Sequence, residues 1–170
     1  MDLRLLLRSG VGIVVALVVW EALAHIITTD LAATLPQRLR LALAALLPAV
    51  FVLNLMIVVQ MRLRAASGAV DPLAGQDSRL LQVNQRVLTN TVEQLVGFVP
   101  ALLALAAGAP PGWMPLIVSA GLVFALMRLV FWGGYLLGPL LRAPGMAAIF
   151  AINVSTLIAA VCVWWPWTYR

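Results

Sequence analysis

Five apolar stretches, each about as long as a membrane-spanning helix, constrain this chain of 170 residues more than any other feature. They cover residues 11–28, 41–59, 79–107, 113–140 and 144–165. A helix needs roughly 20 apolar residues to cross a hydrocarbon core of about 30 Å. Because a backbone in lipid must satisfy its own hydrogen bonds, we expect all five stretches to be helical. The predicted fold class is therefore an all-α integral membrane protein.

The composition excludes several other classes of protein. The chain is 64% hydrophobic and 10% charged, whereas soluble domains are about half apolar and about a quarter charged. The net charge of +5 does not indicate a nucleic-acid partner, because the arginines form no run and lie beside the apolar stretches, as topology signals do. With one His and one Cys, we predict neither a disulfide framework nor a metal site.

The arginines near the ends of the stretches predict the orientation in the membrane. If the N-terminus is inside, the cytoplasmic side carries Arg4, Arg8, Arg62, Arg64, Arg79 and Arg142, and the outer side carries Arg38, Arg40 and Arg170. Aromatic rings prefer membrane interfaces, and the outer interface holds Trp113, Trp164, Trp165, Trp167 and Tyr169. Both signals place the N-terminus and the loop of residues 65–78 in the cytoplasm and the C-terminus outside.

The first stretch has two interpretations. Arg4 and Arg8, an apolar run and the sequence Ala-Leu-Ala at 22–24 imitate a signal peptide with its cleavage site. The run is long for such a peptide and Glu21 lies beside the proposed cut, which favours a retained helix. Glu21 and His25 are one turn apart, and we interpret them as an interfacial pair rather than a proton relay.

Ionisable residues inside the third and fourth stretches are candidates for function, because such groups are costly in a bilayer. Arg86, Asn90 and Glu93 share one face of a helix, and Arg128 and Tyr135 share a face of the next. Counted from the cytoplasmic ends, Glu93 and Arg128 lie at similar depths of roughly 21 and 18 Å. We predict that Glu93 neutralises Arg128 deep in the membrane, either as an architectural pair or as part of a site.

Arg86, Asn90 and Tyr135 form a shallower cluster, because Arg86 and Tyr135 lie only roughly 10 and 8 Å from the cytoplasmic ends of their helices. Guanidinium groups bind carboxylates bidentately, and an amide and a phenol add directional hydrogen bonds. This cluster suits an anionic ligand, with a polar seam between helices as the alternative. For Arg86, which has no close acid of its own in the sequence pattern, we favour the carboxylate of a ligand or partner.

The polar segment resembles the signature of a known family. The run from Arg86 through Asn90 to Glu93 and Gln94, continuing into Phe98-Val99-Pro100, is similar to that of the MAPEG family, the membrane-associated proteins in eicosanoid and glutathione metabolism. Three further segments resemble this family in the same order, namely residues 60–64, 128–135 and 142–144. Together the resemblance covers about residues 41–165.

The resemblance implies a MAPEG-like four-helix membrane domain in residues 38–170, preceded by an extra N-terminal transmembrane helix and connecting loop in residues 1–37. It implies a homotrimer in the inner (cytoplasmic) membrane, surrounded by membrane lipids, with glutathione as cosubstrate between neighbouring subunits. Carried over position by position, the residues that bind glutathione or support its site would be Arg62, Arg86, Asn90, Glu93, Arg128 and Tyr135. The catalytic residue would be Arg142, because a guanidinium near the thiol favours the thiolate.

The chain departs from the family pattern in ways that keep alternatives open. Thr89 replaces a basic residue of several family enzymes, Phe131 and Trp132 stand at positions that are polar in a related enzyme, and Met146 follows where that enzyme has a further Arg. We therefore consider three hypotheses for the function. The first is a thiol-binding protein that conjugates glutathione to a lipophilic small-molecule substrate or reduces lipid peroxides. The second is a non-catalytic lipid-binding or scaffold protein on the same fold. The third is a small transporter, disfavoured by the lack of an inverted repeat.

Overall fold

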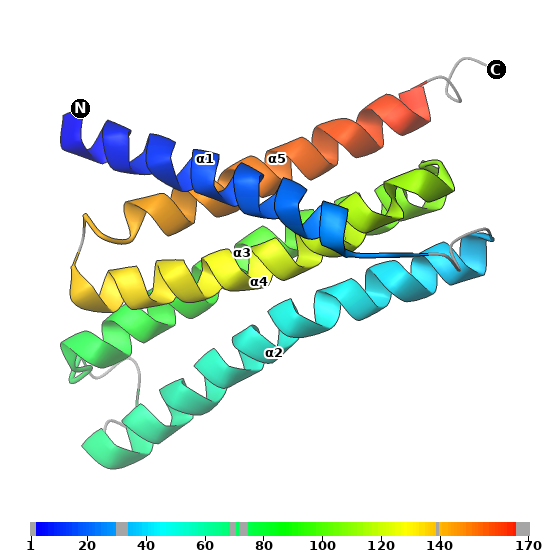
Figure 1. Ribbon diagram of the computed structural model, residues 1–170. Helices are drawn as coiled ribbons and strands as arrows, with labels where there is room; N and C mark the ends of the chain where they lie inside the picture. The colour runs from blue at the N-terminus through cyan, green and yellow to red at the C-terminus, as the bar shows by residue number, and fades with distance from the viewer. Residues whose placement is uncertain (1–2, 30–33, 69–70, 72–74, 139, 166–170) are drawn as a thin grey trace.

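A computed structural model describes residues 3–29, 34–68, 71, 75–138 and 140–165, and this part of the chain holds five long α-helices (Figure 1). They are α1 (Leu3–Ile26), α2 (Leu35–Ser67), α3 (Arg79–Gly108), α4 (Met114–Leu137) and α5 (Ala143–Trp164), with a short 3-10 helix, η1 (Pro111–Trp113), before α4. Each long helix has the length and hydropathy that a membrane span requires. The predicted all-α fold class with five apolar helices is confirmed.

Local signals explain where several helices begin and end. α2 ends at Ser67 because Gly68 adopts a left-handed φ of 65°, which glycine reaches without steric cost. α3 begins after Ser78, whose Oγ accepts a hydrogen bond from the backbone N–H of Leu81 at 3.3 Å. Pro144 lies in the first turn of α5, where the N–H that proline lacks would have no helical partner.

Helix α4 lies at the centre of the molecule, packed against α1, α2, α3 and α5. Helix α3 also packs against α2 and α5, so that α2 to α5 form one bundle, while α1 crosses α5 and α4 on its outside (Figure 1). Glycines allow the closest approaches. Gly121 of α4 faces the backbone of Ala45 of α2, and Gly12 of α1 faces that of Pro144 of α5. Small residues of this kind let helix backbones meet in membrane proteins.

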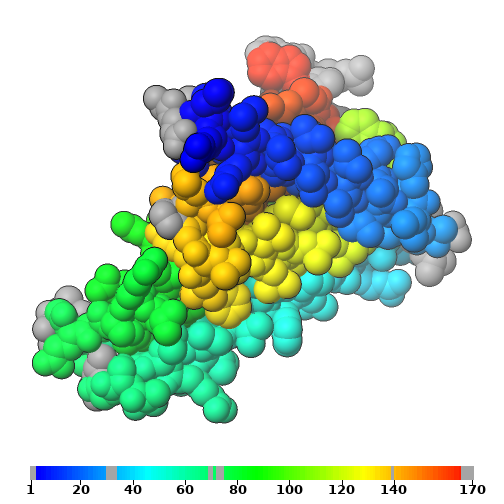
Figure 2. All heavy atoms as spheres, turned by 60° about the vertical axis from the view of Figure 1, so that its left-hand side comes forward, coloured from blue at the N-terminus to red at the C-terminus, as the bar shows by residue number. Residues whose placement is uncertain are grey.

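Helix α1 is attached to the bundle along its length. Its N-terminal half lies over the start of α5 (Figure 2). Further along, Ala16 is fully buried, and the Nε1–H of Trp20 donates a 2.7 Å hydrogen bond to the carbonyl of Leu116 on α4. Glu21 and His25 form the predicted contact, 3.1 Å between Oε1 and Nε2, and both side chains are exposed.

The opposite end of the bundle carries the aromatic residues at the α3–α4 turn and the end of α5. The Nε1–H of Trp164 donates to the carbonyl of Ala104 at 2.9 Å, and the guanidinium of Arg38 donates to the carbonyl of Ala109. These contacts join α5 and α2 to the end of α3. Trp167, Tyr169 and Arg170, which we used for the orientation, lie outside the described residues.

Candidate functional site

A cavity of about 360 Å³ lies where α1, α3, α4 and the start of α5 meet, and we call it the Arg86–Arg142 cavity. Its lining consists of Leu5, Ser9, Arg86, Asn90, Phe131, Tyr135, Arg142, Ala143, Met146 and Ala147. Four predicted site residues thus meet at one place, namely Arg86, Asn90, Tyr135 and Arg142. The volume falls in the usual range for small-molecule sites, roughly 300–1,000 Å³.

Two guanidinium groups give this cavity its positive charge. Arg86 is exposed, and within the described part of the chain it forms no hydrogen bond or ion pair. The guanidinium carbon of Arg142 lies 4.5 Å from the centroid of the Tyr135 ring, a cation–π geometry that holds the group at the cavity wall. Among the described lining residues there is no carboxylate. The cavity is therefore suited to an anionic ligand.

A second cavity, of about 450 Å³, adjoins the first through Arg86 and Tyr135, which line both. We call it the Asp77–Thr89 cavity, and its other lining residues are Asp77, Arg79, Gln82, Val83, Gln85 and Thr89. These side chains come from the start of α3 and the loop before it, and most of them are polar. A ligand with both polar and apolar parts could therefore extend from one cavity into the other.

Arg128 is fully buried beneath the Arg86–Arg142 cavity rather than exposed in it. Its Nη1 donates to Oδ1 of Asn90 at 2.9 Å and its Nη2 donates to the backbone carbonyl of Asn90 at 3.3 Å. The rings of Phe124 and Phe131 lie 5.5 and 5.3 Å from its guanidinium carbon. Arg128 thus fixes the position of Asn90, which lines the cavity.

Glu93 and Arg128, which we predicted to neutralise each other, interact through Asn90 rather than in direct contact. Among the described residues no ion pair joins them. Asn90 contacts both groups instead, since its Nδ2 donates to Oε2 of Glu93 at 3.3 Å and its Oδ1 accepts from Arg128. The reason is that Asn90 lies one turn before Glu93, and Glu93 is exposed at the surface of the protomer. Asn90, predicted in the shallower cluster, is therefore hydrogen-bonded to both members of the deeper pair.

Three of the predicted binding residues do not line these two cavities within one protomer. They are Arg62, Glu93 and Arg128. Arg62 is exposed near the end of α2, and Glu93 is exposed on α3 beside Leu88, Val92 and Val96. A contact between a ligand and Arg62 or Glu93 stays a prediction.

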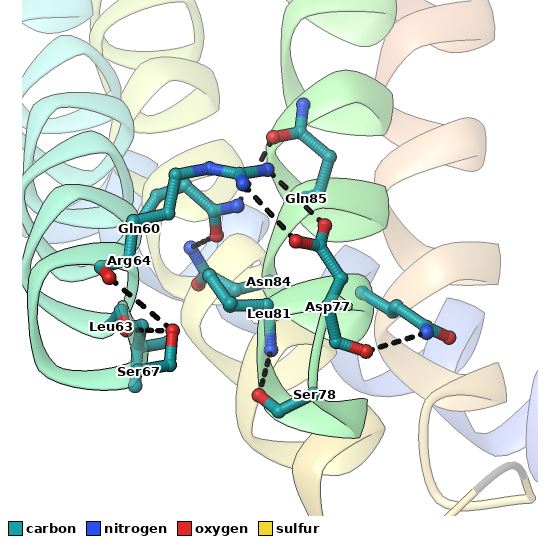
Figure 3. A network of polar contacts seen from close by, with 10 residues as sticks. Gln60, Leu63, Arg64, Ser67, Asp77, Ser78, Leu81, Asn84 and Gln85 are labelled. Atoms are coloured by element: carbon teal, nitrogen blue, oxygen red, sulfur yellow. Dashed lines mark hydrogen bonds and ion pairs between the residues drawn. The ribbon is translucent and has the colours of Figure 1, made fainter. Parts of the chain in front are cut away.

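A polar network, which no motif in the sequence predicted, holds α2, α3 and their connecting loop together (Figure 3). The Nδ2 of Asn84 donates to Oε1 of Gln60 at 2.8 Å, and the Nε2 of Gln60 donates to Oε1 of Gln85 at 3.2 Å. Arg64 makes two hydrogen bonds to the carboxylate of Asp77, at 3.1 and 3.2 Å. The network positions the start of α3, which carries Arg86. Amides inside apolar stretches were the available signal.

The sequence motifs also did not predict that Leu5 and Ser9 line the cavity, because these motifs lie in α2 to α5 and not in α1. Phe131 was noted only as a departure from a polar pattern. In the structure it packs edge-on against Tyr135, with ring centroids 5.7 Å apart. No single residue in α1 signals the cavity in the sequence.

A comparison with protein-family models matches residues 40–162, more than half of the chain, to the MAPEG family. The chain belongs to the MAPEG family. The match covers α2 to α5 and leaves α1 outside it, which confirms a MAPEG four-helix bundle with an additional N-terminal helix. With five candidate spans, this MAPEG protein is a multi-pass membrane protein. Searches of curated proteins and of solved structures gave no significant match.

The MAPEG bundle supplies every predicted site residue. Arg62 comes from α2, Arg86, Asn90 and Glu93 from α3, Arg128 and Tyr135 from α4, and Arg142 from the residue that caps the start of α5. The family therefore accounts for the polar part of the cavity, and α1 adds a wall to it. The domain division after residue 37 stays a prediction.

Proposed function

We propose that this MAPEG protein binds glutathione or a related thiol in the Arg86–Arg142 cavity and its neighbour. The observation that carries the proposal is that one cavity collects two guanidinium groups, an amide and a phenol without a carboxylate in its described lining. Glutathione carries carboxylates and a thiol. Arg86 suits a carboxylate, because guanidinium groups bind carboxylates bidentately, and Arg142 suits the thiolate. Phe131 and Met146, on the apolar side of the cavity, suit a lipophilic second substrate.

In the enzymatic form of this proposal, Arg142 is the catalytic residue. Its guanidinium favours the thiolate of bound glutathione, which is the nucleophile. The sulfur forms a bond to an electrophilic carbon of the lipophilic substrate while a halide leaves. With a lipid peroxide, the thiolate breaks the O–O bond, giving an alcohol and a glutathione sulfenic acid. A second glutathione then converts this acid into the disulfide and water.

The proposed biological unit is a homotrimer. Helix α3 exposes Gln85, Thr89 and Glu93 within a membrane span. Polar groups facing lipid are costly, so a neighbouring subunit that covers this face would stabilise it. In such an assembly Arg62 and Glu93 reach the thiol site from across the subunit boundary. Native mass spectrometry of the protein in mild detergent should give the trimer mass, and a monomer as the sole species would contradict the assembly.

The thiol site is tested with purified protein, glutathione and the chromogenic aryl halide 1-chloro-2,4-dinitrobenzene. We expect glutathione to raise the thermal unfolding temperature and to support turnover. Arg142→Gln should lower kcat by about 100-fold, as removal of one charge-stabilising donor does, but retain the thermal shift. Arg86→Gln should weaken glutathione binding about tenfold, because a bidentate carboxylate contact is lost.

The control is Arg40→Gln, which removes an exposed arginine at the other end of α2 from the site. It should leave both binding and turnover unchanged. If the wild-type protein shows neither turnover nor a glutathione-induced thermal shift, the proposed function is wrong.

A non-catalytic lipid-binding role on the same fold is the second candidate. It is favoured by the apolar residues Phe131 and Met146 in the cavity and by the stacking of Arg142 on the Tyr135 ring, which leave fewer donors for a thiol peptide. In that case a lipid should copurify with the protein, and Arg142→Gln should change no thiol-dependent activity because there is none. Mass spectrometry of an organic extract distinguishes the two functions.

A further inference from the structure

The extra helix α1 forms one wall of the candidate site. Leu5 and Ser9 line the Arg86–Arg142 cavity. With Gly12 and Ala16 they lie on one face of α1, because spacings of four, three and four return to the same side of a helix. Gly12 packs against the backbone of Pro144 and Ala16 is fully buried. One face of α1 therefore packs against the bundle at Gly12 and Ala16 and lines the cavity at Leu5 and Ser9.

The two sides of the cavity differ in chemistry. The polar groups of Arg86, Asn90 and Tyr135 come from α3 and α4. The α1 and α5 side contributes Leu5, Ser9, Ala143, Met146 and Ala147, which are apolar except for one hydroxyl. The ring of Phe131 on α4 adds to this apolar lining, while Arg142, which precedes α5, adds a guanidinium. A thiol peptide with two carboxylates would lie against the first side. The space beside α1 and α5 then remains for the lipophilic partner of the thiol.

We propose that α1 forms the wall against which the lipophilic electrophile binds. The apolar part of the electrophile lies between α1 and α5, and Ser9 limits the size of the electrophile that fits. This inference rests on the proposed function, and it assigns the selection of the second substrate to α1. Its class is an electrophile with an alkyl chain, such as an unsaturated aldehyde. In this reaction the glutathione sulfur bonds to the β-carbon of the aldehyde and the α-carbon takes up a proton, so no group leaves.

Two properties of Ser9 support this role. Its side chain is small, so the cavity stays open at this point of the docking face, and a larger side chain there would fill it. Its hydroxyl forms no hydrogen bond within the described residues, whereas the hydroxyls of Ser67 and Ser119 bond back to their own helices. The Ser9 hydroxyl is therefore available to a polar group of the acceptor.

The first experiment compares Ser9→Leu with Gly10→Leu. Gly10 is exposed and an added Cβ there meets no atom within 4 Å, so its variant is a control on the neighbouring position. With trans-2-nonenal as acceptor, Ser9→Leu should lower kcat/KM about tenfold or more, as loss of fit in an apolar pocket does. The thermal shift caused by glutathione should stay unchanged in both variants. Gly10→Leu should keep the wild-type kcat/KM.

The second experiment does not depend on turnover. Cys162 is exposed, so Cys162→Ser serves as the background for Ser9→Cys and, separately, Gly10→Cys. We expect S-hexylglutathione to slow the maleimide labelling of the thiol introduced at position 9 more than S-methylglutathione does. Neither compound has a free thiol that would consume the maleimide. Labelling at position 10 should be the same with and without either compound.

The outcomes separate this proposal from the one on which it rests. Equal kcat/KM for the two leucine variants, or no protection at position 9 by S-hexylglutathione, would overturn the role of α1 while glutathione binding stands. If Ser9→Leu does not fold, the labelling result alone supports or overturns it. Absence of a glutathione-induced shift in the wild-type protein instead overturns the thiol site itself.

Discussion

Asn90 is the one cavity-lining residue that, among the described residues, is hydrogen-bonded to the buried Arg128. Its side-chain oxygen accepts from the buried guanidinium of Arg128, its amide donates to Glu93, and it also lines the Arg86–Arg142 cavity. A buried guanidinium without its acceptor is costly, because the charged donors would be left unsatisfied in an apolar surrounding. Asn90 therefore contributes to stability as well as to the site.

This geometry predicts different effects for two neighbouring substitutions. Asn90→Ala should lower the free energy of unfolding by about 2 kcal/mol, since Arg128 loses its side-chain acceptor. Glu93→Gln should change it by less than about 0.5 kcal/mol, because the side chain is exposed and glutamine keeps an oxygen that can accept from Asn90. Denaturation of the protein in detergent micelles measures both. If Glu93→Gln proves the more damaging change, a direct ion pair between Glu93 and Arg128 would replace the network described above.

Substitutions in α4 are the most restricted by packing, because α4 contacts all four other long helices. Its approach to α2 depends on Gly121, where an added Cβ would collide with the backbone of Ala45. Gly133, on the same helix, has no atom within 4 Å of an added Cβ. The same chemical change at these two positions therefore isolates the effect of helix contact from the effect of helix propensity.

We expect Gly121→Val to destabilise the bundle by about 3 kcal/mol, because overpacking forces the α2 and α4 backbones apart. Gly133→Val should alter stability by no more than about 0.5 kcal/mol. Thermal unfolding followed by circular dichroism in the same detergent compares the pair. Equal destabilisation of both variants would show that α2 and α4 are not in close backbone contact.

For the whole molecule, the orientation in the membrane is the expectation that remains to be measured. The arginine distribution places the loop of residues 65–78 in the cytoplasm and the start of α2 outside. In a Cys162→Ser background, a membrane-impermeant maleimide added to intact cells should label Thr34→Cys and not Gln76→Cys. Lysis should expose the second thiol. Labelling of Gln76→Cys alone in intact cells would establish the reverse orientation.

The five helices and the family were predictable because each depends on information close together in the chain. A run of apolar residues of sufficient length leaves the backbone few alternatives to a helix in lipid. The spacing of Arg86, Asn90 and Glu93 places them on one face whatever the neighbouring helices do. The meeting of Arg86, Asn90 and Tyr135 at one cavity was also predictable, because it follows from the depth of these residues along their two helices.

Contacts between helices depended on tertiary packing, because the rotation and crossing of two helices are not encoded in the spacing within either one. Equal depth suggested that Glu93 would meet Arg128, but the rotation of α3 turns Glu93 outward and brings Asn90 to the guanidinium. In the same way, hydropathy alone showed α1 to be a fifth apolar helix. Only its close packing on Pro144 carries Leu5 and Ser9 over the cavity.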